Sequence, residues 1–254
     1  MITRAQITRK ASQEGVPARI VEKDYVLAHI VAAIAGLDED SKLVFKGGTA
    51  LRLCHFEDYR YSADLDFSIT DAPLADAITA IGQALGSPGG SVESLRLTDE
   101  SPPRISFVGP LGRERSIKLD LADDEIVFHT ERRGLLPRWP DLPEGRTVLV
   151  YTLLEIAGEK LRCVLQRLQC RDLYDLNLLF EEGVDAAEAV EVFKLKARHR
   201  GLEPDSFALQ YRERSRQYRK RWEAELSEHV PGGVPHFDDV ARRVARRLRQ
   251  TGLM

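Results

Sequence analysis

Two aspartates separated by one residue are the first candidates for chemistry in this sequence. Asp64 and Asp66 alternate with Leu65 and Phe67, which places both carboxylates on one face of a strand whose other face is buried. Carboxylates this close repel each other, and a divalent cation relieves the repulsion. Such a pair is also what phosphoryl and nucleotidyl transfer with two Mg²⁺ ions requires. The spacing therefore predicts a metal site.

A glycine pair precedes these aspartates. Gly47 and Gly48 follow the apolar run 43–45, and residues 49–55 have the composition of a helix. At such a turn the missing Cβ atoms let a phosphate approach the backbone, and the first helix N–H groups point at it. A glycine pair alone is usually a plain loop, and a lone Asp-x-Asp is usually a solvated strand face. Their combination predicts a phosphate-binding turn beside a metal site.

A third carboxylate follows in another alternating run. Residues 117–121 alternate, and Asp120 faces away from the apolar positions. We expect Asp120 to join Asp64 and Asp66 in a three-carboxylate site if the two strands are neighbours.

A lysine in the second half of the chain is a further candidate. Thr152 and Glu155 match a capping box, which predicts a helix that begins near residue 153. Its apolar face leaves Lys160 and Arg167 on a common polar side. Lys160 is either an ordinary surface lysine or a residue that contacts triphosphate oxygens.

The next helical run supplies two more acids. Asp172 and Asp175 lie in the segment RDLYDL, in which Arg171 and Asp175 have the i,i+4 spacing of an intrahelical salt bridge. The functional alternative is that one of these acids orients Lys160 or a catalytic base.

The surrounding elements alternate between helix and strand in the first half of the chain. Periodic apolar positions predict helices over 18–34 and 73–85, and short apolar runs predict strands at 105–108 and 117–121. Residues 132–146 hold three prolines and two glycines, which is typical of a linker. We therefore expect two domains, an α/β domain over 1–138 and a helical domain over 139–254.

Composition indicates an ordinary globular protein. The 254 residues are 43% hydrophobic, without an apolar run of membrane-spanning length or the apolar segment of a signal peptide. A cytoplasmic location is expected. The three cysteines form no Cys-x-x-Cys pair, which favours reduced thiols over disulfides or a zinc site.

Charge is distributed unevenly along the chain. Residues 1–130 carry 14 Lys and Arg against 20 Asp and Glu, whereas residues 131–254 carry 23 against 20. Basic residues concentrate between 194 and 221. This segment is either a solvated helical face or a nucleic-acid contact surface.

Four ordered segments, LVFKGGTALRL, SADLDFSI, EIAGEKLRCVLQR and RDLYDL, together resemble the AbiEii/AbiGii (MenT-like) toxin family. The resemblance covers roughly residues 20 to 180. It implies an α/β fold, in which a DNA polymerase β-type nucleotidyltransferase domain with a mixed sheet precedes a C-terminal helical domain. It also implies the toxin of a toxin–antitoxin pair with a cognate antitoxin protein. The implied reaction is Mg²⁺-dependent transfer of NMP from an NTP to the 3′ end of tRNA, which blocks aminoacylation and translation.

The resemblance also assigns roles to individual residues. Metal binding falls to Asp64 and Asp66, and more loosely to Asp120. Catalytic roles are assigned to Asp64, Asp66, Lys160, Asp172 and Asp175. The residues implied to bind the nucleotide are Gly47, Gly48, Thr49, Ser62 and Lys160.

Two other functions remain open at this point. The same carboxylates could serve nucleotidylation of a protein or small-molecule hydroxyl. Alternatively, the protein could be a non-catalytic nucleotide- or RNA-binding module.

Overall fold

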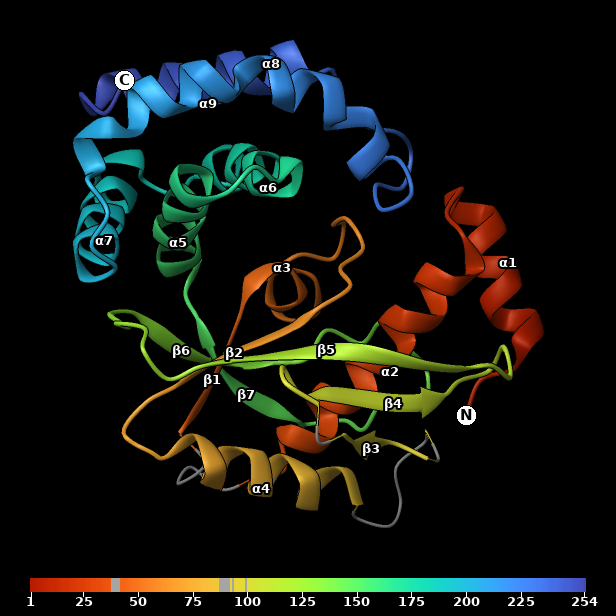
Figure 1. Ribbon diagram of the computed structural model, residues 1–254. Coiled ribbons are helices and arrows are strands. Elements are labelled where there is room, and N and C mark those ends of the chain that lie inside the picture. Colours follow the sequence, from red (N-terminus) through yellow and green to blue (C-terminus); the bar gives the residue numbers. More distant parts are fainter. Residues whose placement is uncertain (38–41, 87–91, 93, 99) are drawn as a thin grey trace. The chain divides into compact units, whose positions relative to one another are not determined.

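The computed structural model describes residues 1–37, 42–86, 92, 94–98 and 100–254 (Figure 1). The chain divides into two compact units. The first consists of residues 1–124 and 130–150, and the second of residues 125–129 and 151–254.

The first unit is built on a mixed β-sheet. Within the described residues the sheet has seven strands in the order β3-β4-β5-β2-β1-β7-β6. Strand β1 pairs antiparallel with β2 and parallel with β7, β2 pairs parallel with β5, and β5 pairs antiparallel with β4. The α/β class with a mixed sheet is confirmed. The strands are β1 (Leu43–Lys46), β2 (Leu65–Ile69), β3 (Arg96–Leu97), β4 (Arg104–Val108), β5 (Glu114–Ala122), β6 (Thr130–Gly134) and β7 (Thr147–Tyr151).

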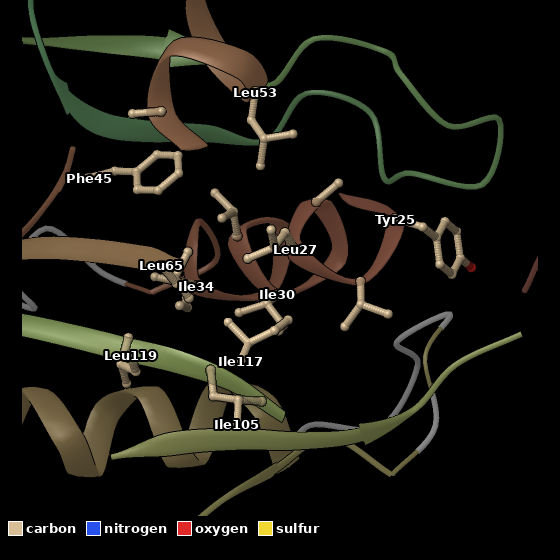
Figure 2. Close-up of a cluster of buried hydrophobic side chains, with 14 of the residues drawn as sticks. Tyr25, Leu27, Ile30, Ile34, Phe45, Leu53, Leu65, Ile105, Ile117 and Leu119 are labelled. Atoms are coloured by element: carbon tan, nitrogen blue, oxygen red, sulfur yellow. The ribbon is translucent and has the colours of Figure 1, made fainter. Parts of the chain in front are cut away.

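One nearly all-buried helix organises the core of this unit. Helix α2 (Ala18–Ile34) begins just after Pro17 and has the bounds that its apolar periodicity predicts. Its side chains Leu27 and Ile30 lie in the centre of the apolar cluster, between residues of β1 and the following helix and residues of β4 and β5 (Figure 2). Full burial of each such side chain contributes about 1.5–3 kcal/mol to folding. The other helices of the unit include α1 (Arg4–Glu14) and α4 (Leu74–Gly86).

The second unit is helical, as expected for the C-terminal part of the chain. It contains α5 (Leu153–Gln166), α6 (Cys170–Glu181), α7 (Ala186–His199), the short 3₁₀ turn η3 (Pro204–Ser206), α8 (Phe207–Leu226) and α9 (Phe237–Gln250).

The start of α5 corrects half of the predicted capping box. Thr152 Oγ1 accepts the N–H of Glu155 at 3.2 Å, as predicted. The Glu155 carboxylate, however, is fully buried and accepts the backbone N–H groups of Phe128 and His129 at 3.2 and 3.1 Å. It also pairs with the Lys196 ammonium at 2.7 Å. The Glu155 carboxylate therefore binds other segments of the chain, although the local pattern predicts that it caps its own helix.

The division between the units differs from the expected boundary at residue 138. Strand β7 continues the sheet, because its Val150 is the register partner of Phe45 in β1. The proline-rich stretch therefore connects β6 to β7 inside the first unit. Residues 125–129 join the second unit, where Glu155 and Lys196 hold them.

The cysteines are free and buried, in agreement with the expectation of reduced thiols. Burial raises the pKa of Cys54 to about 12 and that of Cys163 to about 11. Among the described helices, none combines the length and the hydropathy that a membrane crossing needs.

Candidate active site

The glycine turn lies directly against a carboxylate. Strand β1 ends at Lys46, and the short helix α3 (Gly47–Ala50) follows and runs into the π-helical turn η2 (Leu51–His55). Gly47 has φ +77°, and a Cβ atom at this position would lie 2.6 Å from Asp66 Oδ2. A Cβ atom at Gly48 would lie 2.6 Å from a guanidinium nitrogen of Arg60. Both positions therefore need glycine, one for its backbone conformation and both for space.

The predicted third carboxylate adjoins the second. Asp66 in β2 is the register partner of Asp120 in the parallel strand β5, so their backbones are about 4.8 Å apart. Asp64 lies just before β2 and is half-buried like Asp66. Asp120 is more exposed, with 51% of its side chain accessible. The structure thus places Asp66 and Asp120 side by side on neighbouring strands, near the start of β2 and near the end of β5, and Asp64 precedes Asp66 by two residues.

Lysines that the sequence analysis did not single out lie near these acids. Lys118 pairs with Asp120 at 2.7 Å. Lys46 is buried and is the register partner of Asp66. Burial lowers the pKa of Lys23 on α2, whereas the Asp64 carboxylate acts in the opposite direction. Lys46 directly precedes the glycine pair, and this position was the signal that could have identified it.

Two hydroxyls lie at the turn. Thr49 is buried, and its Oγ1 donates to the backbone carbonyl of Asp64. Thr49 therefore ties the helix to the entrance of β2. Ser62 is also buried, and its Oγ is 3.1 Å from the position that a Cβ atom of Gly48 would occupy.

The buried ion pair between Arg52 and Asp24 stabilises the segment after the glycine turn. The sequence did not predict it. The Arg52 guanidinium donates to the Asp24 carboxylate through Nε and, at 3.3 Å, through Nη2. It also donates to the carbonyl of Tyr59 and lies 3.7 Å from the centre of the Tyr61 ring. Arg52 thereby links η2 to α2 and to the segment that leads into Ser62. Since Asp24 and Arg52 are 28 residues apart, no local period relates them.

The other predicted site residues meet in the second unit. Lys160 Nζ lies 2.9 Å from Asp172 Oδ1 and 2.7 Å from Asp175 Oδ2. Both aspartates are fully buried and Lys160 is 6% exposed, so the surface-lysine alternative is wrong. Arg167 also donates to Asp172, at 2.9 Å. Burial raises the pKa of Asp172, but Lys160 and Arg167 outweigh it and hold this pKa below its usual value.

The carboxylates of the first unit suit a divalent cation by their chemistry. Among the described residues, no three His, Cys, Asp or Glu side chains are already grouped as a metal site. Carboxylate oxygens are nevertheless the ligands that Mg²⁺ prefers. Asp66 Oδ2 also lies close against Gly47, so this carboxylate oxygen is directed at the glycine turn. The residues present therefore fit Mg²⁺.

Much of the basic segment 194–221 serves the fold of the second unit. Lys196 is fully buried with Glu155. Arg214 donates to the carbonyls of Val164 and Leu165 at 2.9 and 2.8 Å, near the end of α5. These two cations are consequently committed to internal partners and do not belong to a nucleic-acid surface.

Comparison with protein-family models identifies one family. A family model described as "Nucleotidyl transferase AbiEii toxin, Type IV TA system" matches residues 29–243. Among solved structures, the nucleotidyltransferase toxin MenT4 from Mycobacterium tuberculosis H37Rv is 20% identical, with a TM-score of 0.72 over 100% of this chain and 89% of that chain. That similarity establishes a shared fold. No curated protein matches the sequence.

A second solved structure is an antigenic nucleotidyltransferase-like protein from Paracoccidioides brasiliensis. It is 15% identical and covers 74% of this chain and 92% of that chain. Its TM-score of 0.42 is too low to support an argument.

Proposed function

Because the chain belongs to the AbiEii family of nucleotidyltransferase toxins, we propose that it transfers a nucleoside monophosphate from an NTP to the 3′ end of tRNA in a Mg²⁺-dependent reaction. The addition would block aminoacylation and so translation. Family membership also implies an antitoxin partner. The observation that carries the proposal is the register pairing of Asp66 with Asp120 beside the glycine turn.

Asp64, Asp66 and Asp120 are the residues that would hold Mg²⁺. When bound, Mg²⁺ would neutralise phosphate charge and polarise the phosphoryl group. The backbone N–H groups of Gly47, Gly48 and Thr49 would contact the phosphates, because a helix N-terminus favours anions. Ser62 lies against Gly48 and would border the bound nucleotide.

The reaction would be a single displacement at phosphorus. The terminal ribose hydroxyl of the acceptor attacks the α-phosphorus, a new P–O bond forms, and the bond to the bridging oxygen of the β-phosphate breaks. Pyrophosphate leaves. The hydroxyl proton passes to Asp120, which is the most exposed of the three carboxylates and thus accessible to an acceptor.

Lys160, Asp172 and Asp175 are proposed to contribute to nucleotide binding and catalysis, as the family resemblance implies. The two ion pairs of Lys160 hold its ammonium in one orientation. This supports a positioned lysine instead of a mobile one, since each carboxylate restricts its rotamers.

The deciding experiment offers the protein several acceptors at once. The purified protein is incubated with each labelled NTP and with separate tRNA, protein and aminoglycoside fractions, with and without Mg²⁺. We expect label at the 3′ end of tRNA, only with Mg²⁺, and none with Asp66→Asn. Label on the protein or aminoglycoside fraction would replace the acceptor, and no label in any fraction would favour a non-catalytic module.

A further inference from the structure

A cavity of about 430 Å³ lies between α8 and α9 in the second unit. Its size falls in the range of roughly 300–1,000 Å³ that small-ligand sites occupy. Three arginines reach it, Arg212 from α8 and Arg242 and Arg249 from α9, and Ala245 and Tyr211 contribute apolar surface. A cavity with several cations and an apolar wall suits an anion that carries a larger organic group.

The charges at this cavity are weakly compensated. Within the part of the chain that the structure describes, no acidic side chain pairs with Arg212 or Arg249. Arg242 has a single exposed partner, Asp239, at 3.2 Å. Arg246 lies one turn from Arg242 on α9 and is exposed. Three arginines against Asp239 and the terminal carboxylate of Met254, which also lines the cavity, leave a positive charge that an anionic ligand would neutralise.

A buried hydroxyl at this cavity also needs an explanation. Tyr211 is 7% exposed, and its hydroxyl oxygen is buried without a hydrogen-bond partner among the described residues. Its ring is stacked on Phe207, with the planes 4° apart. Burial raises the pKa of Tyr211 to about 12, so the hydroxyl remains a neutral donor at physiological pH. Since buried polar groups are normally satisfied, an acceptor on a bound ligand or a water molecule would complete this hydroxyl.

Basic residues continue from the cavity along α8. Arg216 and Lys220 follow Arg212 at successive four-residue steps, and both are exposed. Four-residue steps keep side chains on one helix face. A row of cations suits the repeated phosphates of a nucleic-acid chain better than a single free anion.

We propose that the α8–α9 cavity binds one nucleotide of the acceptor RNA, with its phosphate at Arg212 and Arg249 and its sugar or base against Tyr211 and Ala245. This assignment rests on the proposed function for the identity of the acceptor as RNA. A free nucleotide offers the same phosphate chemistry, and the row of cations along α8 favours the RNA chain.

The test compares two pairs of substitutions in the full chain. Arg212→Ala with Arg249→Ala removes the cavity cations, and Arg9→Ala with Arg198→Ala removes two exposed arginines elsewhere. Binding of a labelled bulk tRNA fraction is measured across a salt series, without NTP. We expect the cavity pair to weaken binding at least about tenfold, because two charge-assisted contacts are lost. The log–log salt slope should fall by about one per arginine, and the control pair should leave both unchanged.

Tyr211→Phe isolates the hydroxyl. Removal of an unpaired buried donor should keep or raise the thermal midpoint, while the affinity for tRNA falls several-fold if the ligand accepts its hydrogen bond. An unchanged affinity would show that Tyr211 has only a structural role and would contradict the cavity site.

The remaining outcomes separate the alternatives. Equal weakening by the two pairs would indicate diffuse electrostatic attraction and overturn the proposal. ATP binding is measured separately for the same variants. Loss of ATP binding with tRNA binding intact would assign the cavity to a free nucleotide and overturn the RNA assignment. Because the binding assay contains no NTP, cavity-dependent tRNA binding without transfer would refute the proposed function alone. Transfer to tRNA with parental affinity in the cavity variant would refute the cavity alone.

Discussion

At the scale of single residues, a substitution of Asp66 should affect catalysis and stability differently. Its half-buried carboxylate lies on β2 next to Asp120, its register partner on the adjacent strand β5. Like charges at this spacing repel in the absence of a cation. We expect Asp66→Ala to lower transfer by at least about a hundredfold, since a metal ligand is lost. The thermal midpoint should not fall. Transfer at the parental rate by the variant would refute the carboxylate site.

Gly47 allows a matched pair of glycine substitutions. Gly47→Ala places a methyl group 2.6 Å from Asp66 Oδ2 at φ +77°, whereas Gly145→Ala at φ +69° meets nothing within 4 Å among the described residues. Both should lose about 1–2 kcal/mol of unfolding free energy to the left-handed backbone. Only Gly47→Ala should also displace the carboxylate and reduce transfer. Urea denaturation and single-turnover rates for both variants measure this; similar activity in the two would show that the clash is relieved elsewhere.

Asp172 links the ion cluster to acid stability. Its pKa in the folded protein is below the usual value, so its contribution to stability is complete above the unfolded pKa of about 3.9. That contribution decreases as the pH falls through the folded pKa. Unfolding free energies of the parent and Asp172→Asn, measured from neutral pH into this acidic window, should converge at the acidic end. Parallel curves would mean that another carboxylate determines acid unfolding.

The environment of a side chain can be predicted from the sequence where a local pattern determines it. Strand alternation sufficed to predict that Leu65 and Phe67 are buried, and the alternation over 117–121 correctly predicted an exposed Asp120 next to buried Ile117 and Leu119. Arg52 and Asp24 had no such pattern, because their contact depends on how α2 packs against η2. The sequence does not decide between a surface lysine and a site residue at Lys160, since an apolar stripe does not reveal that two aspartates of the next helix will pair with it.

At the scale of helices and strands, the close approach of α5 to α7 depends on Gly158. A Cβ atom at Gly158 would lie 2.4 Å from Val192 Cγ1 and 3.1 Å from the Phe193 backbone nitrogen. We expect Gly158→Ala to cost about 1–3 kcal/mol through overpacking, despite the gain of up to about 1 kcal/mol in helix propensity. Val192→Ala on the same background should recover part of this loss. A double-mutant cycle from denaturation curves measures the coupling; additive effects would contradict the close approach.

Element boundaries were predictable where apolar periodicity was strong. Helix α2 has the predicted bounds, and β4 and β5 extend the predicted runs. Strand β6 was missed because its sequence TERRG lacks the apolar residues of a strand. Its neighbour in the sheet is β7. Prolines around it then suggested a linker instead of a connection between strands.

At the scale of the whole molecule, the stability of the second unit depends on the segment 125–129, which precedes β6. Lys196 is fully buried and donates to the Ile126 carbonyl at 2.7 Å, and Glu125 pairs with Arg162 and Arg200. We expect a fragment of residues 125–254 to fold more stably than one of residues 151–254. The shorter fragment leaves buried charges with fewer partners, at a cost of about 3–5 kcal/mol. Thermal unfolding followed by circular dichroism compares the two; equal midpoints would show that the segment 125–129 adds nothing.

The segment 125–129 limits how recombination can exchange the two units between related proteins. The second unit begins before the first is complete, so no single cut in the gene separates one intact unit from the other. A recombination event at the start of α5 would bring in a helical unit that lacks its own anchoring segment. Functional chimaeras between relatives should therefore exchange residues 125–129 together with residues 151–254, which needs three crossover points, before residue 125, after residue 129 and after residue 150. The catalytic and helical parts of this chain are expected to diverge as one linked gene segment.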